Sequence, residues 1–190
     1  MPLSRTALYR GRIVDFGIES IRQPDGRTLE IEVVRHPGGA AVVALDYDRR
    51  VCLLRQFRAP FEDWLWELPA GKIDGQEEPL LTARRELQEE AGLEAATWRS
   101  LGSVVTCPGF CDEVVHLFLA TDLSRAHQRT EADEFIEVHW WPFARALREA
   151  QAGGLRDVKT VVALMRAATA VGLVGPLEPS GPDIRDPSGP

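Results

Sequence analysis

This chain of 190 residues has no long apolar run, and its 22 basic residues are outnumbered by 29 acidic ones. No apolar stretch approaches the roughly 20 residues that a membrane-spanning helix needs, and the first residues do not resemble a signal peptide. The formal net charge is −7 and the pI is about 5.2, whereas nucleic acids and anionic membranes bind basic surfaces. We therefore expect a cytoplasmic protein that binds neither nucleic acid nor membrane.

Cysteine and lysine are also rare. The three cysteines are Cys52, Cys107 and Cys111, an odd number without a CxxC pair or a cluster of histidines. We interpret them as reduced thiols, with redox or metal chemistry at Cys107 and Cys111 as the alternative. Lys72 and Lys159 are the only lysines. The remaining positive charge is arginine, which is the better bidentate partner for phosphate.

What the chain does contain is enough apolar sequence for one core, since 44% of its residues are hydrophobic. Hydrophobic periodicity and turn residues predict strands over residues 8–16, 18–22, 29–33, 40–45, 50–57, 98–106, 114–120 and 135–141. They predict helices over residues 77–91, 142–151 and 158–171. We expect the strands at 40–45 and 50–57 to be neighbours in a central sheet. The order of elements is mixed α and β rather than a βαβ repeat.

The two ends of the chain differ from its middle. Residues 1–38 are typical of a twisted hairpin or three-stranded piece, which we treat as an N-terminal β-subdomain. Residues 39–175 hold the expected central sheet and its helices. Residues 176–190 are rich in proline and glycine and have little to bury, so we expect a disordered tail.

The expected helix at 77–91 ends in the sequence RRELQEEAGL, which places three glutamates on one face. Glu86, Glu89 and Glu90 are spaced i, i+3 and i+4, so they share an arc of about 100° and repel one another. Carboxylate oxygens suit Mg²⁺ or Mn²⁺, and such cations would turn the repulsion into attraction and could hold a diphosphate. The alternative is a solvated acidic face with ion pairs to neighbouring arginines.

A longer pattern surrounds these glutamates. It consists of Gly71, Glu77 six residues later, and then Arg85-Glu86-Leu87, Glu89-Glu90 and Gly92-Leu93. The pattern resembles the Nudix box, GX5EX7REUXEEXGU, in which U is a bulky aliphatic residue, and every fixed position matches. At ordinary residue frequencies a chance match at a given start is on the order of 10⁻¹⁰. A solvated acidic face does not explain the glycine and glutamate upstream of the helix.

The resemblance implies an α+β Nudix fold, in which a mixed β-sheet is sandwiched between helices behind the small N-terminal β-subdomain. It also implies an enzyme that uses bound Mg²⁺, with Mn²⁺ as a substitute, to hydrolyse nucleoside diphosphates linked to another moiety. Carried over by position, the implied metal ligands are Glu86, Glu89, Glu90 and the carbonyl of Ala70. Arg85 is expected to hold a neighbouring carboxylate in place.

Three other stretches resemble the ADP-ribose pyrophosphatase branch of the family. Residues 107–113, CPGFCDE, resemble its S-P-G-x-x-D/E-E loop, with Cys107 in place of the serine. Residues 55–58 resemble its R-Q-x-R segment, and residues 66–71 resemble its E-x-P-A-G segment. With these stretches, the resemblance runs over roughly residues 8–170 of the chain.

The same resemblance assigns contacts with the substrate. It implies that Arg58 binds the diphosphate, that Glu67 binds the base and that Glu113 binds the terminal ribose. Gly109 and Arg35 are further expected contacts. For Arg58 the alternative is the solvated end of a strand, where arginine is common.

Residues 131–138, EADEFIEV, resemble a mobile acidic loop that brings a glutamate to the metal ions and the attacking water. Glu134 is the residue that we expect in this role, both as a metal ligand and as a catalytic group, and Glu131 is the alternative. A carboxylate near two cations could orient water or accept its proton. The competing interpretation is an acidic loop beside a strand.

The resemblance thus predicts that ADP-ribose and water give AMP and ribose 5-phosphate, in a homodimer joined through the N-terminal subdomain. A GDP-mannose or other nucleotide-sugar hydrolase is the alternative enzyme, because residues 154–160, GLRDVKT, resemble a segment found in both groups. A Nudix-fold ligand sensor without turnover is the alternative outside enzymes. Where relatives stack the adenine on aromatic side chains, this chain has Ile13 and Leu29, with Tyr9 or Phe16 as candidate substitutes.

Overall fold

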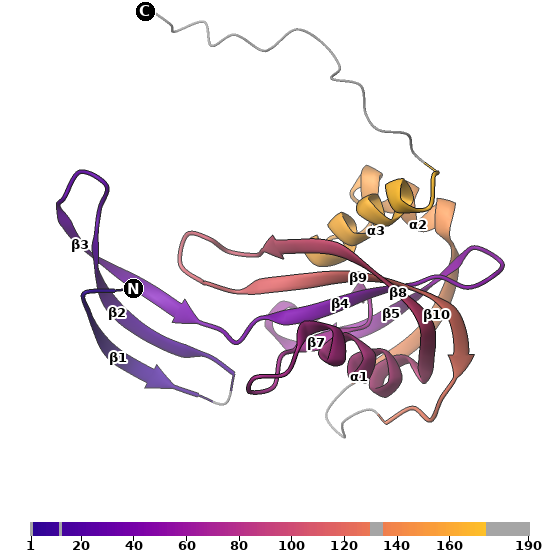
Figure 1. The fold of residues 1–190 in the computed structure, drawn as a ribbon, viewed down its shortest axis with the longest axis horizontal. Helices are drawn as coiled ribbons and strands as arrows, with labels where there is room; N and C mark the ends of the chain where they lie inside the picture. The colour runs from indigo at the N-terminus through magenta and orange to yellow at the C-terminus, as the bar shows by residue number, and fades with distance from the viewer. Residues whose placement is uncertain (1, 12, 130–134, 174–190) are drawn as a thin grey trace, which may run out of the picture.

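The computed structural model describes residues 2–11, 13–129 and 135–173, so the expected tail at 176–190 lies outside the described residues. The strands are β1 (Ser4–Arg10), β2 (Asp15–Arg22), β3 (Thr28–Arg35), β4 (Gly39–Ala44), β5 (Arg50–Arg58), β6 (Asp63–Glu67), β7 (Ala70–Lys72), β8 (Leu93–Val105), β9 (Val114–Arg125) and β10 (Ile136–Pro142). The helices are α1 (Pro79–Ala91), α2 (Phe143–Ala152) and α3 (Val158–Ala170), with a short 3₁₀ helix, η1 (Ala59–Phe61), after β5. Figure 1 shows β1, β2 and β3 at one end of the molecule and all the helices in a larger body.

The body contains two sheets. β7, β4, β9 and β8 form one sheet in that order, with β4 parallel to β9, and β10, β5 and β6 form an antiparallel second sheet. The expectation that residues 40–45 and 50–57 are neighbours in one sheet is wrong. Because β7 and β9 occupy the two edges of β4, β5 pairs with β6 and β10 instead. An isolated bridge between Leu45 and Val51 marks the point where the two strands separate.

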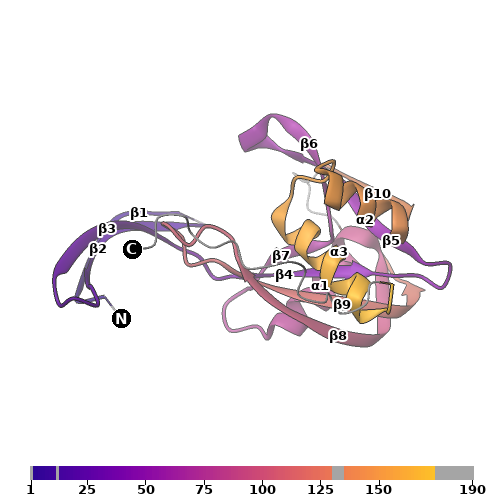
Figure 2. The same ribbon diagram turned by 90° about the horizontal axis from the view of Figure 1, so that it is seen from above.

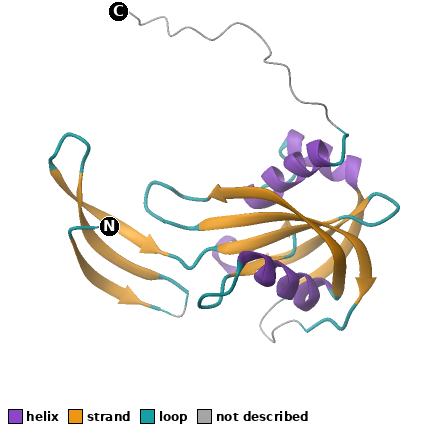
Figure 3. Ribbon diagram, viewed as in Figure 1, coloured by secondary structure: helices purple, strands orange, loops and turns teal. Residues whose placement is uncertain are grey.

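Strand β4 is the centre of the packing, and each of its residues is buried. Its alternate side chains point to opposite faces of the sheet. Ala41 and Val43 belong to the core cluster that contains residues of α2 and α3, whereas Ala40 and Val42 belong to the cluster that contains residues of α1. Figure 3 shows helices on both sides of the sheet. The expected α+β architecture, a mixed sheet sandwiched between helices, is confirmed.

Helix α1 carries the acidic face, and each of its ends has a physical cause. Pro79 occupies the first turn, where an absent N–H leaves no hydrogen bond unmade, so the helix begins two residues after the expected position 77. Gly92 ends the helix in the left-handed conformation, with φ 64°. Ala83 and Leu87 are completely buried in the core beneath β4, which fixes the rotation of the helix about its axis.

The N-terminal strands form a separate antiparallel sheet in the order β1, β2, β3. In Figures 1 and 2 this sheet extends away from the body, and the tip of the hairpin between β8 and β9 reaches toward it. The expected single strand over residues 8–16 is wrong, because the chain reverses after β1. The N–H of Gly11 donates to the carbonyl of Val14 (2.9 Å), and this hydrogen bond closes the reversal.

The other differences from the expected elements are short strands and shifted ends. The sequence patterns do not single out β6 or β7, β8 begins directly after α1 instead of at residue 98, and β9 continues beyond residue 120. The remaining expected strands and helices end within three residues of the observed ones. In the described part of the chain, no helix is both long enough and apolar enough to cross a membrane.

Candidate active site

A cavity of about 1050 Å³ lies between α1, β7, the end of β5, the start of α3 and the loop after β8. Its wall brings together residues that are far apart in the sequence. The expected site residues in this wall are Arg58, Ala70, Arg85, Glu86, Glu89, Glu90 and Glu113. Three other expected residues are described but do not line the cavity, namely Arg35, Glu67 and Gly109. Glu134 and Glu131 lie outside the described residues.

Glu86 and Glu90 both lie against strand β7. A side chain on Gly71 would lie 1.9 Å from Oε1 of Glu86, so only glycine leaves room for this carboxylate. The nearly buried Glu90 accepts a hydrogen bond of 2.8 Å from the N–H of Ala70. Two carboxylates one helical turn apart thus converge on the same two residues of backbone. The glycine of the motif serves this close approach rather than a turn.

Arg85 lies at the centre of the carboxylates on and beside α1. Its Nη1 donates to Glu86 (2.7 Å) and to Glu89 (2.9 Å). Its Nη2 donates to Glu77 (3.2 Å) and to the carbonyl of Lys72 (3.1 Å). Burial opposes the charge, yet the hydrogen bonds and nearby carboxylates raise the pKa of Arg85. One guanidinium therefore offsets the repulsion between the glutamates of this face.

Glu77 ties the loop before α1 to the helix itself. Its carboxylate accepts hydrogen bonds from the hydroxyl of Thr82 (2.8 Å) and from Arg85 (3.2 Å). Burial works against the charged form, but these hydrogen bonds lower the pKa of Glu77. The spacing of eight residues between Glu77 and Arg85 in the motif thus places the two side chains in contact.

The oxygen atoms on this face suit a divalent cation. Glu86 and Glu90 flank one backbone segment, and carboxylate and carbonyl oxygens are the ligands that Mg²⁺ and Mn²⁺ prefer. The carbonyl of Ala70 is the expected further oxygen. Among the described residues, no three His, Cys, Asp or Glu side chains form a ready-made metal cluster. The donor set fits the cation by its chemistry, and a bound cation would compete with Arg85 for the oxygens of Glu86.

Glu67, at the end of β6, is the buried centre of a second group of charges. It is 2% exposed and accepts hydrogen bonds from Nε and Nη2 of Arg58 (2.6 and 2.8 Å) and from Nζ of Lys159 (2.5 Å). Burial alone would raise its pKa, but the two cations lower the pKa of Glu67 to about 2. The carboxylate is therefore charged and lies behind Arg58 and Lys159, not in the cavity wall.

Lys159 is a cavity residue that the sequence patterns did not assign to the site. It lies in the first turn of α3 and also contacts Asp157 (3.0 Å), whose carboxylate caps the helix by accepting from the N–H of Thr160 (3.1 Å). Two features of the sequence could have pointed to Lys159 as a site residue. It is one of only two lysines in the chain, and it lies in the GLRDVKT segment.

Glu113 enters the cavity from the loop between β8 and β9. Its Oε2 accepts a hydrogen bond from the hydroxyl of Thr106 (2.7 Å), and its Oε1 lies 3.4 Å from Nδ1 of His36. Cys107, in place of the expected serine, is a free thiol in the same cavity wall. A side chain at Gly109 would meet no described atom within 4 Å, so this glycine is not required for space.

The apolar part of the cavity wall differs from the expected base platform. Ile13 lines the cavity. The other three candidate positions for a base platform, Tyr9, Phe16 and Leu29, are described but do not line it. Phe57 and Phe61, which the sequence patterns did not assign to the site, do line it. Both rings are exposed and flank Arg58 in the sequence, so they offer apolar surface close to a charged group.

Known proteins share both the motif and the fold of this chain. The model of the NUDIX domain matches residues 35–161. The ADP-ribose pyrophosphatase of Bacillus subtilis is 37% identical over 164 residues, which cover 85% of this chain and 89% of that protein. The ADP-ribose pyrophosphatase of Mycobacterium tuberculosis is 41% identical over 157 residues, which cover 80% of this chain and 74% of that protein.

A GDP-mannose pyrophosphatase of Cronobacter sakazakii is 37% identical over 150 residues, which cover 70% of this chain and 78% of that protein. The crystal structure of an ADP compounds hydrolase is similar in fold, with a TM-score of 0.76 at 21% identity over 92% of this chain and 96% of that chain. The matched domain spans more than half of the 190 residues and contains the complete motif on α1 and the loop before it. The chain therefore belongs to the Nudix hydrolase family.

Proposed function

We propose that this Nudix hydrolase cleaves the diphosphate of ADP-ribose, so that ADP-ribose and water give AMP and ribose 5-phosphate. The observation that carries the proposal is one cavity in which the acidic face of α1 meets basic side chains from other elements, Arg58 and Lys159 among them. A diphosphate carries negative charge on both phosphates, so it needs positive partners on more than one side. The similarity to two proteins named ADP-ribose pyrophosphatase supports this choice of substrate.

The acidic face of α1 is proposed to hold Mg²⁺, with Mn²⁺ as a substitute, because Nudix hydrolases generally use a divalent metal ion. Glu86 and Glu90 are the main ligands in this proposal, with Glu89 and the carbonyl of Ala70 as further ligands. When bound, the cation neutralises charge on the diphosphate and makes hydroxide available near neutral pH. Arg85 holds the carboxylates in place beside the loop.

Arg58 and Lys159 are proposed to bind the diphosphate, Arg58 through its planar guanidinium and Lys159 as a point charge. Both cations contact Glu67, so we assign this glutamate to their orientation instead of the base contact that the resemblance implies. Glu113 is proposed at the terminal ribose, because a carboxylate accepts hydrogen bonds from sugar hydroxyls. Gly109 stays a proposed part of the same loop.

The residue that orients or deprotonates the attacking water is proposed to be Glu134, with Glu131 as the alternative. Glu134→Gln is expected to lower kcat at least about tenfold, because an amide cannot accept the proton of water. Circular dichroism and thermal unfolding check that the variant is folded. Near-normal turnover in Glu134→Gln together with a loss in Glu131→Gln would transfer the role to Glu131.

A cytoplasmic homodimer, joined through residues 1–38 and separate from the hydrolase body at 39–175, is the proposed form of the enzyme. The N-terminal sheet and its turns expose large apolar side chains, which favour burial in an interface. These side chains are Leu3, Leu8, Tyr9, Ile13 and Leu29. Sedimentation velocity over a range of concentrations tests the proposal, and a monomer throughout the range would contradict it.

GDP-mannose is the second candidate substrate. Lys159 is compatible with either substrate, since this residue lines the cavity and lies in the segment that resembles both groups. Similarity to a GDP-mannose pyrophosphatase adds support. The expected base platform has no aromatic residue at its two principal positions, Ile13 and Leu29, so these positions favour neither adenine nor guanine.

One assay separates the candidates. The enzyme is incubated with ADP-ribose, GDP-mannose, NADH or diadenosine polyphosphates, with Mg²⁺ or with a chelator, and the products are treated with phosphatase. Phosphatase releases phosphate from the monoester products but not from an intact diphosphate. ADP-ribose is expected among the best substrates, and its absence from them would contradict the proposal. A ligand sensor would bind a nucleotide and release no phosphate.

A further inference from the structure

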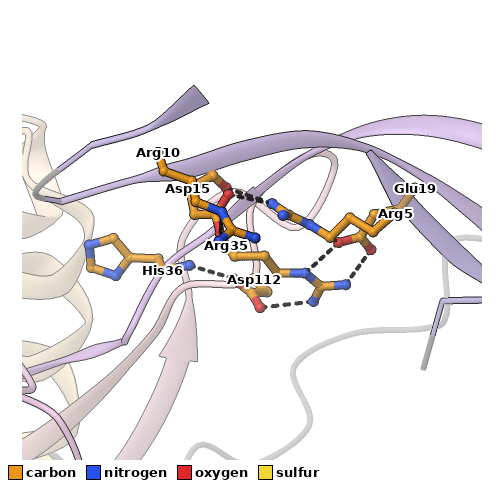
Figure 4. Close-up of polar contacts among 7 residues, drawn as sticks. All are labelled: Arg5, Arg10, Asp15, Glu19, Arg35, His36 and Asp112. Atoms are coloured by element: carbon orange, nitrogen blue, oxygen red, sulfur yellow. Dashed lines mark hydrogen bonds and ion pairs between the residues drawn. The ribbon is translucent and has the colours of Figure 1, made fainter. Parts of the chain in front are cut away.

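The N-terminal sheet holds a buried carboxylate between two arginines (Figure 4). Glu19 on β2 is 1% exposed, and its Oε1 accepts hydrogen bonds from Nε of Arg5 (2.9 Å) and from Nε of Arg35 (2.9 Å). Its Oε2 accepts a further hydrogen bond from Nη2 of Arg35. The bidentate contact fixes the plane of the Arg35 guanidinium.

The other side of the Arg35 guanidinium reaches the loop between β8 and β9. Its Nη1 donates to Oδ2 of Asp112 (2.9 Å), and the backbone N–H of His36 donates to Oδ1 of the same carboxylate (2.8 Å). The backbones are also joined, because the N–H of Val34 donates to the carbonyl of Phe110 (2.7 Å) and the N–H of Asp112 donates to the carbonyl of Val34 (3.3 Å). We call these four contacts between residues 34–36 and 110–112 the clamp.

The clamp ends next to Glu113, which lines the cavity. Glu113 follows Asp112 directly in the chain, and its carboxylate accepts a hydrogen bond from the hydroxyl of Thr106 (2.7 Å). The backbone of His36 holds Asp112, and its ring nitrogen Nδ1, which accepts from the N–H of Gly38 (3.1 Å), lies 3.4 Å from the carboxylate of Glu113. Neither Arg35 nor Asp112 is among the residues of the described chain that line the cavity. Arg35 therefore contacts the loop that carries Glu113 but does not line the cavity itself.

We propose that Arg35 is a positioning residue for the sugar end of the site, where it fixes Asp112 and thereby Glu113. This inference rests on the proposed function, in which Glu113 binds the terminal ribose. It replaces the direct substrate contact that the resemblance implies for Arg35. The N-terminal sheet then has a part in substrate recognition within one chain, through the carboxylate of Glu19 that orients the arginine.

The expected effect is on substrate binding rather than on folding. The ion pair between Arg35 and Asp112, whose side chains are 40% and 41% exposed, contributes little to the free energy of unfolding. Arg35→Met also removes two hydrogen bonds from the buried carboxylate of Glu19, so thermal unfolding must show that Arg35→Met, like Arg5→Met, is folded at the assay temperature. The acidic face of α1 makes none of the contacts of the clamp. A displaced Glu113 should therefore raise KM and leave kcat nearly unchanged.

Arg35→Met and Arg5→Met form a matched pair, because each removes one arginine from Glu19 but only Arg35 reaches Asp112. Arg35→Met is expected to raise KM for ADP-ribose about tenfold, and Arg5→Met less than about twofold, with kcat of both within about twofold of wild type. Asp112→Asn, which leaves Glu19 and both arginines in place, should resemble Arg35→Met. Arg35→Lys should fall between wild type and Arg35→Met, because one ammonium cannot reproduce the planar fork.

Two further measurements separate positioning from direct contact. In a Glu113→Ala background, Arg35→Met should change KM no further, since its target is already absent. With the β-methyl ester of ADP, which keeps both phosphates and lacks the sugar, Arg35→Met should leave KM unchanged. The proposal is overturned if Arg35→Met keeps its full effect in either case, or if Arg5→Met raises KM as much as Arg35→Met does.

Hydrogen exchange supplies a readout that does not need turnover. The amides of Val34 and Asp112 should exchange faster in Arg35→Met than in Arg5→Met, and equal exchange would overturn the positioning role. If wild-type protein does not cleave ADP-ribose, the proposed function fails, and exchange still decides whether Arg35 holds the loop. The two failures are thus distinguishable.

Discussion

Two arginines each organise several carboxylates in this molecule, over very different distances along the chain. Arg85 contacts three glutamates that lie within eight residues of it, whereas Arg35 contacts Glu19 and Asp112, which lie 16 and 77 residues away. The first group shapes one face of α1, and the second joins the N-terminal sheet to a loop of the body. The difference teaches that, in this proposal, the reaction and the choice of substrate are controlled by separate charge networks.

Neutralising a carboxylate of α1 is the strongest test of whether the two charge networks have separate functions. Glu86→Gln is expected to lower kcat about a thousandfold with little change in KM, because a bound cation stabilises transition-state charge by several kcal/mol. Glu90→Gln should behave similarly. Steady-state kinetics at saturating Mg²⁺ measure the effect, with Glu94→Gln, an exposed position outside the cavity, as the control. A change confined to KM would remove the distinction between the two networks.

The carboxylate of Glu67 is also held by cations, and we expect it to contribute to the stability of the fold. Glu67, like Glu19, is almost completely buried and is held by two cations. The pKa of Glu67 is about 2 in the folded protein and 4.5 ordinarily, so its contribution is fully present above about pH 4.5 and is lost as the pH falls toward 2. Glu67→Gln is expected to lower the free energy of unfolding by about 3 kcal/mol at neutral pH.

Urea unfolding at several pH values measures this contribution. Wild-type stability should decline between about pH 4.5 and pH 2, and the decline should be shallower in Glu67→Gln because the titrating group is absent. Glu30→Gln, at an exposed position of β3, is the matched control. Equal slopes in wild type and Glu67→Gln would show that the contact with Arg58 and Lys159 does not control acid stability.

The smallest expected effect comes from one added methyl group. Gly71→Ala would place Cβ 1.9 Å from Oε1 of Glu86, so the carboxylate must move although no charge has changed. We expect kcat to fall about tenfold, since a displacement of this size misaligns a catalytic group. In a Glu86→Gln background the same substitution should cost less, because both changes act on one side chain. Independent, additive losses would argue that Gly71 acts elsewhere.

The acidic face of α1 could be predicted because its contacts are local. Helical spacing alone places Glu86 and Glu90 on one face, and the motif adds Gly71 and Glu77 at fixed distances. The contact between Glu77 and Arg85 and the close approach of Gly71 to Glu86 then explain why the motif has this spacing.

The contacts of Arg35 and Glu67 could not be predicted, because their partners come from distant parts of the chain. Asp112 is 77 residues from Arg35, and Lys159 is 92 residues from Glu67. A resemblance transfers positions in the sequence but not the side chains that surround them. Both residues were therefore expected at the substrate, and the structure places both outside the cavity wall. The separation of β4 from β5 has a similar cause, since periodicity predicts a strand but not which edges it pairs.

Strand β4 has a consequence for how this enzyme can be altered. Its six residues are all buried, and its side chains pack alternately into the core cluster on one face of the sheet and into the cluster on the other face. A change in the size of one side chain therefore affects the helices on one face only. Enlarging Ala40 would push on α1 and thereby on the carboxylates of the cavity, whereas enlarging Ala41 would push on the α2 and α3 layer behind the sheet. Substitutions at neighbouring residues of one strand can thus change either the position of the cavity carboxylates or the packing of α2 and α3, independently of each other.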